Sequence, residues 1–215
     1  MLELEGIRYQ PITGKLTVLD EINLKLFEGE PTLVAGRSGS GKTTLLEVMS
    51  GLAEPTSGNI KWNNKIINIR QRRWLCGLVF QFPERHFLGL TVGQELCLGH
   101  YHLGDFAIQN VLEKVRLKGI SLQTPPERLS GGQQRRLAIA VQLLRNPKVL
   151  LLDEPTAGLD WSMRDEVLEL LNDIGKTRAM LIVTHEQEIF IPIVKQILEL
   201  DKGRIRIPPK QRIVD

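Results

Sequence analysis

A glycine-rich stretch early in the chain has the residue types and spacing of an anion site. It reads Gly36, Arg37, Ser38, Gly39, Ser40, Gly41, Lys42, Thr43 and Thr44, and it fits G-x-x-x-x-G-K-[ST] at every fixed position. Glycines let a backbone curl so that successive N–H groups point inward at an anion. The stretch is therefore predicted to cradle the phosphates of a nucleotide.

The flanks of this stretch agree with that prediction. Residues 31–35 read as a buried strand before it, and residues 44–49 have helical spacing after it. The positive N-terminal end of that helix adds to the anion site. By resemblance to phosphate-binding-loop proteins, Lys42 would reach the β- and γ-phosphates, Thr43 would hold Mg²⁺ through its hydroxyl and Thr44 would contact the α-phosphate. The alternative, a glycine-rich turn with an incidental lysine, does not account for the matching flanks.

Two carboxylates, Asp153 and Glu154, follow an apolar run over residues 149–152. They are expected at the C-terminal end of a central strand, the edge where open α/β sheets bind ligands. Asp153 suits a Mg²⁺ shell, directly or through water. Glu154 is placed to orient or deprotonate an attacking water. In isolation, the same residues could be a buried strand with a solvated acidic cap.

A third group stands directly before a predicted helix over residues 133–145. Ser130 can cap the helix, and Gly131 and Gly132 expose backbone N–H groups at its positive end, beside Gln133. These residues predict a second anion site, independent of the first. A capped helix start is the plainer alternative, but the whole run of residues 129–140 favours the anion site.

The elements that must position these groups alternate in type along the chain. Strands are predicted over residues 2–9, 18–27, 31–35, 76–80, 149–152 and 179–183, hairpins over 59–62/65–69 and 196–201/204–207, and helices over 92–98, 106–115, 133–145, 162–174 and 186–194. Residues 51–58 read as a loop, and Gln71, Arg72 and Arg73 as a solvated face.

This pattern predicts an α/β fold: a phosphate-binding-loop NTPase core with a mostly parallel central sheet, an N-terminal antiparallel β subdomain and an inserted α-helical subdomain. We expect one domain over residues 1–215, with the α/β core in 1–82 and 146–215 and the helical subdomain in about 83–145.

Composition excludes several classes of protein. The 215 residues are 42% hydrophobic and 25% charged, which is ordinary for a globular domain, and a net charge of +3 is too small for a nucleic-acid footprint. No apolar run approaches the roughly 18 residues that span a bilayer. Cys76 and Cys97 are expected to be reduced core thiols in a cytosolic compartment. The start of the chain lacks a secretory signal pattern.

In this order and spacing, the motifs resemble those of the nucleotide-binding subunit of an ATP-binding-cassette (ABC) transporter, from end to end of the chain. The matches are Tyr9 (the aromatic that stacks on adenine), residues 36–44 (Walker A), Gln81 (the Q-loop), residues 129–133 (the signature motif), residues 149–154 (Walker B), Asp160 (the D-loop) and His185 (the switch histidine).

The resemblance implies a mechanism. Two cassettes, identical or different, close head-to-tail over two ATP molecules, each held between the phosphate loop of one chain and residues 130–133 of the other. Glu154 acts on the water, His185 contacts the γ-phosphate, and Gln81 senses Mg²⁺ and a transmembrane partner. Asp160 carries communication between the paired sites. The implied location is the cytoplasmic face of a membrane, or an organelle equivalent, with membrane contact only through the partner and no nucleic acid.

A finer resemblance lies in residues 79–87, which are similar to the Q-loop region of energy-coupling-factor importers of vitamins and transition-metal ions. Those importers commonly have Gln where His86 stands. Phe87 and Leu88 would pack under a coupling helix of the partner, or would belong to the subdomain core. Lys210–Arg212 could touch a partner or acidic lipid headgroups.

Other functions stay open at this point. A soluble ABC-type ATPase acting on DNA or ribosomes is one, and a subunit of another transporter class is a second. DNA-acting relatives insert long coiled coils between Walker A and the signature, where this chain has only a short helical region without sustained heptads. An inactive regulatory cassette is disfavoured because Lys42, Ser130, Glu154 and His185 are all present.

Overall fold

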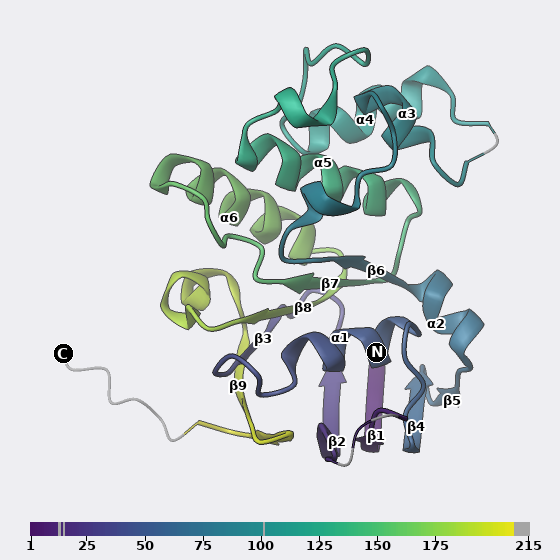
Figure 1. Cartoon of the computed structure of the whole chain (residues 1–215), viewed down its shortest axis with the longest axis vertical. Helices are drawn as coiled ribbons and strands as arrows, with labels where there is room; N and C mark the ends of the chain where they lie inside the picture. The colour runs from purple at the N-terminus through teal and green to yellow at the C-terminus, as the bar shows by residue number, and fades with distance from the viewer. Residues whose placement is uncertain (13, 15, 101, 209–215) are drawn as a thin grey trace.

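The computed structural model describes residues 1–208 except 13, 15 and 101, so that Lys210–Arg212 lies outside the described residues. Within these residues the strands form two sheets (Figure 1), one of four strands in the order β2-β1-β4-β5 and one of six in the order β10-β9-β3-β8-β7-β6. None of the described helices combines the length and apolarity needed to cross a bilayer.

The smaller sheet is antiparallel and comes from the first third of the chain. Its strands are β1 (Leu2–Tyr9), β2 (Leu19–Leu26), β4 (Ser57–Trp62) and β5 (Lys65–Ile66). In β2, apolar residues are buried in alternation with polar ones, the mark of a strand with one face on the core. Asn63 and Asn64 both have positive φ, as a tight hairpin turn requires. The predicted antiparallel subdomain is confirmed, although β4 begins within the stretch expected as loop.

The larger sheet is parallel except at one edge. Its strands are β3 (Thr32–Ala35), β6 (Cys76–Val79), β7 (Val149–Asp153), β8 (Ala179–Thr184), β9 (Gln196–Asp201) and β10 (Arg204–Arg206), of which only β10 runs antiparallel to its neighbour. Every residue of β3, β7 and β8 is buried, because helices or strands cover both faces of the sheet. The predicted fold class is confirmed.

Helices pack on both faces of the larger sheet, as Figure 1 shows. Helix α1 (Lys42–Ser50) lies between the two sheets and contributes to one apolar core. On the other face lie α3 (Val92–Cys97), α4 (Asp105–Lys114), α5 (Gly131–Leu144) and α6 (Trp161–Gly175), which share the second core. Short 3-10 turns, η1 (Pro83–His86) and η2 (Pro126–Arg128), frame the helical segment.

One helix was missed in the sequence analysis. Residues 65–69 were expected to be strand, but β5 ends at Ile66 and α2 (Ile69–Leu75) begins three residues later. A capping box starts this helix, since the side chains of Asn68 and Gln71 each accept a hydrogen bond from the other's backbone N–H. The prediction of a solvated face was wrong for Arg72, which is buried.

Three further expectations need correction. Residues 187–193 form the 3-10 helix η3 (Gln187–Ile193) in place of a regular helix, and Pro192 lies inside it, where the proline lacks the N–H that an α-helix needs. Cys97 is exposed, so only Cys76 is a core thiol, and both cysteines are free. Helix α5 begins at Gly131, two residues before the predicted start.

Candidate nucleotide-binding site

The turn between β3 and α1 depends on glycines for two different reasons. A Cβ on Gly36 would lie 2.6 Å from the carbonyl oxygen of Leu200 and 2.7 Å from Ser40 Oγ, so the backbone can pass here only without a side chain. Gly41 has φ of 106°, a conformation that other residues avoid. The turn therefore keeps the tight curl that a phosphate-binding loop requires.

Lys42 is held in place by the loop that precedes it. Its side chain is buried, and its Nζ donates to the carbonyl oxygens of Gly36, at 2.8 Å, and Arg37, at 3.2 Å. Ser40 Oγ is buried nearby and makes no hydrogen bond within the described residues. A buried hydroxyl without a partner and a fixed ammonium suit an anion that accepts hydrogen bonds from both.

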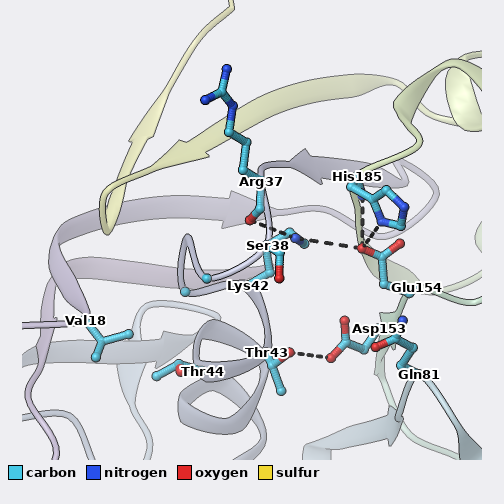
Figure 2. A pocket seen from close by; sticks show the side chains of 12 residues that line it. Val18, Arg37, Ser38, Lys42, Thr43, Thr44, Gln81, Asp153, Glu154 and His185 are labelled. Carbon is cyan, nitrogen blue, oxygen red and sulfur yellow. Dashed lines mark hydrogen bonds and ion pairs between the residues drawn. The ribbon is translucent and has the colours of Figure 1, made fainter.

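Thr43 and Asp153 join the first turn of α1 to the end of β7. Thr43 Oγ1 donates to Asp153 Oδ2 at 2.7 Å (Figure 2). Burial raises the pKa of the Asp153 carboxyl above its ordinary value, while the hydrogen bond from Thr43 acts in the opposite direction. Hydroxyl and carboxylate oxygens are the donors that Mg²⁺ prefers, so these two residues fit such an ion.

No group of three or more His, Cys, Asp or Glu side chains suited to a metal occurs among the described residues. A Mg²⁺ ion bound by Thr43 and Asp153 would therefore take further oxygens from water or from a nucleotide's phosphates, as is usual for this ion.

Glu154 is the most constrained side chain of the site. Its φ is 45°, and its carboxylate is buried. Thr184 Oγ1 donates to Oε2 at 2.7 Å, while Oε1 accepts from the backbone N–H of His185 at 3.0 Å and lies 2.8 Å from His185 Nδ1. Lys42 Nζ lies 3.8 Å from the same oxygen. Strained backbone and over-determined hydrogen bonding are typical of functional positions.

These groups surround one cavity of about 500 Å³ at the carboxyl edge of the larger sheet (Figure 2). Its lining residues are Val18, Arg37, Ser38, Gly39, Gly41, Lys42, Thr43, Thr44, Gln81, Asp153, Glu154 and His185. The structure thus brings together the phosphate loop, both carboxylates, the glutamine and the histidine, which lie far apart in the sequence.

Two residues at the site were not singled out by sequence analysis. Val18 lines the cavity, and an apolar residue at a strand start carries no signal for this role. Thr184 fixes Glu154, and its only signal was a hydroxyl at the end of a strand next to His185.

Other predicted site residues lie outside this cavity. Tyr9 is half-buried and packs against the core around α1, and its carbonyl accepts from the N–H of the lining residue Val18 at 2.8 Å. Gln133 Oε1 accepts from Ser130 N at 2.9 Å, and Ser130 Oγ accepts from Gln133 N at 3.3 Å, so the two residues form a capping box at the start of α5.

Packing also fixes the positions around these caps. A Cβ on Gly132 would lie 3.0 Å from Met163 Cβ of α6, so a glycine lets the two helices approach. Asp160 caps α6, where its side chain accepts from Met163 N at 2.9 Å. Gly131, Gly132 and Asp160 are absent from the cavity lining.

Comparison with known families agrees with this geometry. Residues 19–157 match the family model described as "ABC transporter". The chain belongs to the ABC transporter family. The matched region contains the phosphate loop, the signature residues and both carboxylates.

Two similar proteins illustrate the range of this ABC subunit's relatives. "ABC transporter I family member 11, chloroplastic" from Arabidopsis thaliana is 35% identical over 226 residues, which is 96% of this chain and 80% of that protein. "Energy-coupling factor transporter ATP-binding protein EcfA2" from Enterococcus faecalis is 37% identical over 213 residues, covering 92% of this chain and 74% of that protein.

Two solved structures share the fold. The cbiO1 protein of Clostridium perfringens, described as part of the ABC transporter complex cbiONQ, superposes with a TM-score of 0.83 at 32% identity, covering 95% of this chain and 86% of that one. The dimeric ATP-binding cassette MJ0796, bound to ADP and Pi, gives 0.79 at 27% identity over 96% and 97% of the two chains. This subunit is an ABC ATPase whose ATP hydrolysis is coupled to transport.

Proposed function

We propose that this cassette binds ATP with Mg²⁺ in the cavity at the sheet edge and hydrolyses it only when a second cassette completes the site. The observation that carries the proposal is the composition of the cavity. It contains Lys42, Thr43, Asp153, Glu154 and His185, which are groups for phosphate, metal and water, but residues 130–133 do not line it. A partner's copy of residues 130–133 would close the open side, in line with the dimeric form of MJ0796.

In this proposal each residue has a role that its position supports. Lys42 and the N–H groups of residues 36–44 hold the phosphates at the positive end of α1. Thr43, Asp153 and Gln81 hold Mg²⁺, which neutralises phosphate charge when bound.

The water and the base are assigned to other groups. Glu154 orients or deprotonates the water, and His185 reaches the γ-phosphate. Tyr9, whose carbonyl accepts from the N–H of the lining residue Val18, stacks on adenine. Asp160, at the start of α6, carries communication between the paired sites.

The transport class we infer is an energy-coupling-factor-like importer of a vitamin or metal ion. Support comes from the names of EcfA2 and cbiO1 and from the likeness of residues 79–87 to such importers. The cassette would lie on the cytoplasmic face of a membrane, or its organelle equivalent, held there by a transmembrane subunit. Leu88 is exposed and Phe87 packs against the core, so Leu88 is the side chain of the two that is free to contact this subunit.

The role of Glu154 is tested by Glu154→Gln, which keeps the shape and removes the base. We expect ATP binding to persist, turnover to fall by about 100-fold or more, and ATP to hold the protein as a dimer. Glu186→Gln is the matched control, because Glu186 is a nearby carboxylate that pairs with Arg164 at the surface and does not line the cavity. Unchanged turnover in Glu154→Gln would refute the assignment of the base.

The transport class is tested by isolating the chain from native membranes. A co-purifying integral membrane subunit and a second cassette would support the importer. Ribosomes or nucleic acid in their place would contradict it and would favour a soluble ABC ATPase. Uptake of labelled vitamins or divalent metal ions by vesicles containing the complex then identifies the substrate.

A further inference from the structure

The side chain of Arg135 on α5 is buried and makes hydrogen bonds to loops outside its own helix. The residue is only 3% exposed, and its guanidinium donates to three backbone carbonyls from two separate loops. One nitrogen, Nη1, donates to Gln81 O and, at 3.2 Å, to Phe80 O. The other, Nη2, donates to Ala157 O at 3.2 Å. A single side chain therefore joins α5 to the loop after β6 and the loop after β7.

The chemistry of these contacts is specific to arginine. A guanidinium is a planar fork with donors in fixed directions, so it can bridge two loops that a lysine's point charge cannot reach together. Its only polar partners in the part of the chain that the structure describes are carbonyls, and Nε has none. A buried charge held this way is costly, which sets Arg135 apart from an ordinary surface arginine.

The next residue provides a contrast. Arg136 is also buried, but it pairs with the Glu166 carboxylate of α6 at 2.9 Å and donates to Gly132 O and Arg116 O. Its contacts join helices to one another on one face of the sheet. Arg135, by comparison, reaches the sheet edge itself.

The two loops that Arg135 joins lead to the cavity from different sides. Gln81 lines the cavity. Ala157 follows Glu154, whose carbonyl accepts from Ala157 N at 3.1 Å, and the chain then runs to Asp160, the cap of α6. Helix α5 itself begins after Ser130. Arg135 thus lies where three segments with proposed roles in ATP binding converge.

We propose that Arg135 is a positioning residue that fixes the Gln81 loop and the 154–160 turn to the start of α5, so that the three segments move as one unit. The proposal rests on the function proposed above, since it concerns the same site. A displacement of residues 130–133, where the partner's nucleotide is expected, would then carry Gln81 and Ala157 with it.

Hydrogen–deuterium exchange on the full chain without nucleotide tests this coupling. In Arg135→Met, amides of residues 80–82 and of residues 156–159 should both exchange roughly tenfold faster or more, because both loops lose their anchor. Arg72→Met is the matched control, since Arg72 is also 3% exposed, donates to a carbonyl, Val48 O, and leaves Nε without a partner. Its loss should spare both segments.

Arg135→Lys provides a second test of the coupling if Arg135→Met fails to fold. An ammonium can hold one loop but not both, so at most one of the two segments should regain its protection. The affinity of Arg135→Lys for ATP should stay within about threefold of the wild-type value, while its turnover falls by about tenfold or more. A loss of turnover without a loss of affinity indicates that the groups around the nucleotide are misplaced while binding is intact.

Several results would overturn the proposal: wild-type exchange in both segments of the Arg135 variants, full restoration by lysine, or equal effects in Arg72→Met. The exchange measurement needs no hydrolysis, so its outcome is separate from that of Glu154→Gln. If Glu154→Gln hydrolyses ATP normally while the Arg135 variants loosen both loops, the role proposed for Glu154 fails and the coupling stands.

Discussion

Removing one hydroxyl at the end of β8 should slow ATP turnover while keeping the volume of the side chain that carries it. Thr184 Oγ1 donates to Glu154 Oε2 at 2.7 Å and accepts from Glu186 N at 3.0 Å, and both Thr184 and Glu154 are buried. Thr184→Val keeps the branched side chain and removes both bonds. The carboxylate would then be free to turn about the bonds that Oε1 makes with His185.

The size of the effect follows from the kind of bond. A hydrogen bond to a charged group contributes about 1.5–3 kcal/mol, and a loss of that size in transition-state stabilisation slows turnover by about 10- to 150-fold. The folded state loses the same bond, so a destabilisation of about 2 kcal/mol should lower the melting temperature by about 4–8 °C in a domain of this size.

Steady-state ATP hydrolysis, an ATP titration and thermal unfolding measure these effects together. Thr184→Ser retains the hydroxyl and should recover most of the turnover. Thr32→Val is the matched control, because Thr32 is a buried threonine on the adjacent strand β3, and within the described part of the chain its hydroxyl makes one long contact, 3.4 Å, with Gln196 Oε1. Wild-type turnover in Thr184→Val, or an equal loss in Thr32→Val, would refute the reasoning that Thr184 orients Glu154.

Three further predictions concern nucleotide contacts and thiols. Lys42→Ala should abolish ATP affinity, since the Lys42 ammonium is the buried cation of the phosphate loop and lines the cavity beside Arg37, and normal binding in a calorimetric titration would contradict this. Tyr9→Ala should weaken ATP binding by about 1–3 kcal/mol, the range for a base stacked on an aromatic ring, and unchanged affinity would mean that adenine binds elsewhere. The exposed Cys97 should react with iodoacetamide at about pH 8, while Cys76 stays unmodified until the protein unfolds. Burial raises the pKa of Cys76 to about 12, so that at about pH 8 only about one Cys76 side chain in 10⁴ is a thiolate. Rapid labelling of Cys76 in the folded protein would show that its thiol is not buried in this way.

Motifs whose geometry is local could be predicted from sequence. The phosphate loop combines glycines, a lysine and hydroxyls within nine positions, and its conformation follows from those residues. The strand before Asp153 and Glu154 was equally clear, because four apolar residues in a row are typical of a strand covered on both faces.

Helix α2 shows where local reasoning failed. The apolar pair Ile66–Ile67 reads as strand, yet Asn68 and Gln71 have the spacing of a capping box, a signal that was present and not used. The charge of Arg72 favours a solvated face, but this interpretation ignores which side of a helix the residue would occupy. On α2 it points inward and donates to Val48 O, at the end of α1.

Contacts between distant segments could not be predicted at all. The bond from Thr184 to Glu154 spans 30 residues, and the bonds from Arg135 to Phe80 and Gln81 span 55 and 54. Periodicity describes one element at a time and contains no information on which ends meet. A positive charge next to the apolar run of α5 was the only sequence signal for Arg135, and it is shared by Arg136, whose partners differ.

The positions of the two apolar cores explain why such long-range contacts matter here. Helix α1, which begins with Lys42, belongs to the core on one face of the larger sheet, and α5, which begins after Ser130, belongs to the core on the other. The sheet lies between the two helices, its strands β3, β7 and β8 are fully buried, and a close-packed interior of this kind transmits strain. We expect a second route from α5 to the cavity around the carboxyl edge of the sheet, through the loops after β6 and β7. Those are the two loops that Arg135 holds.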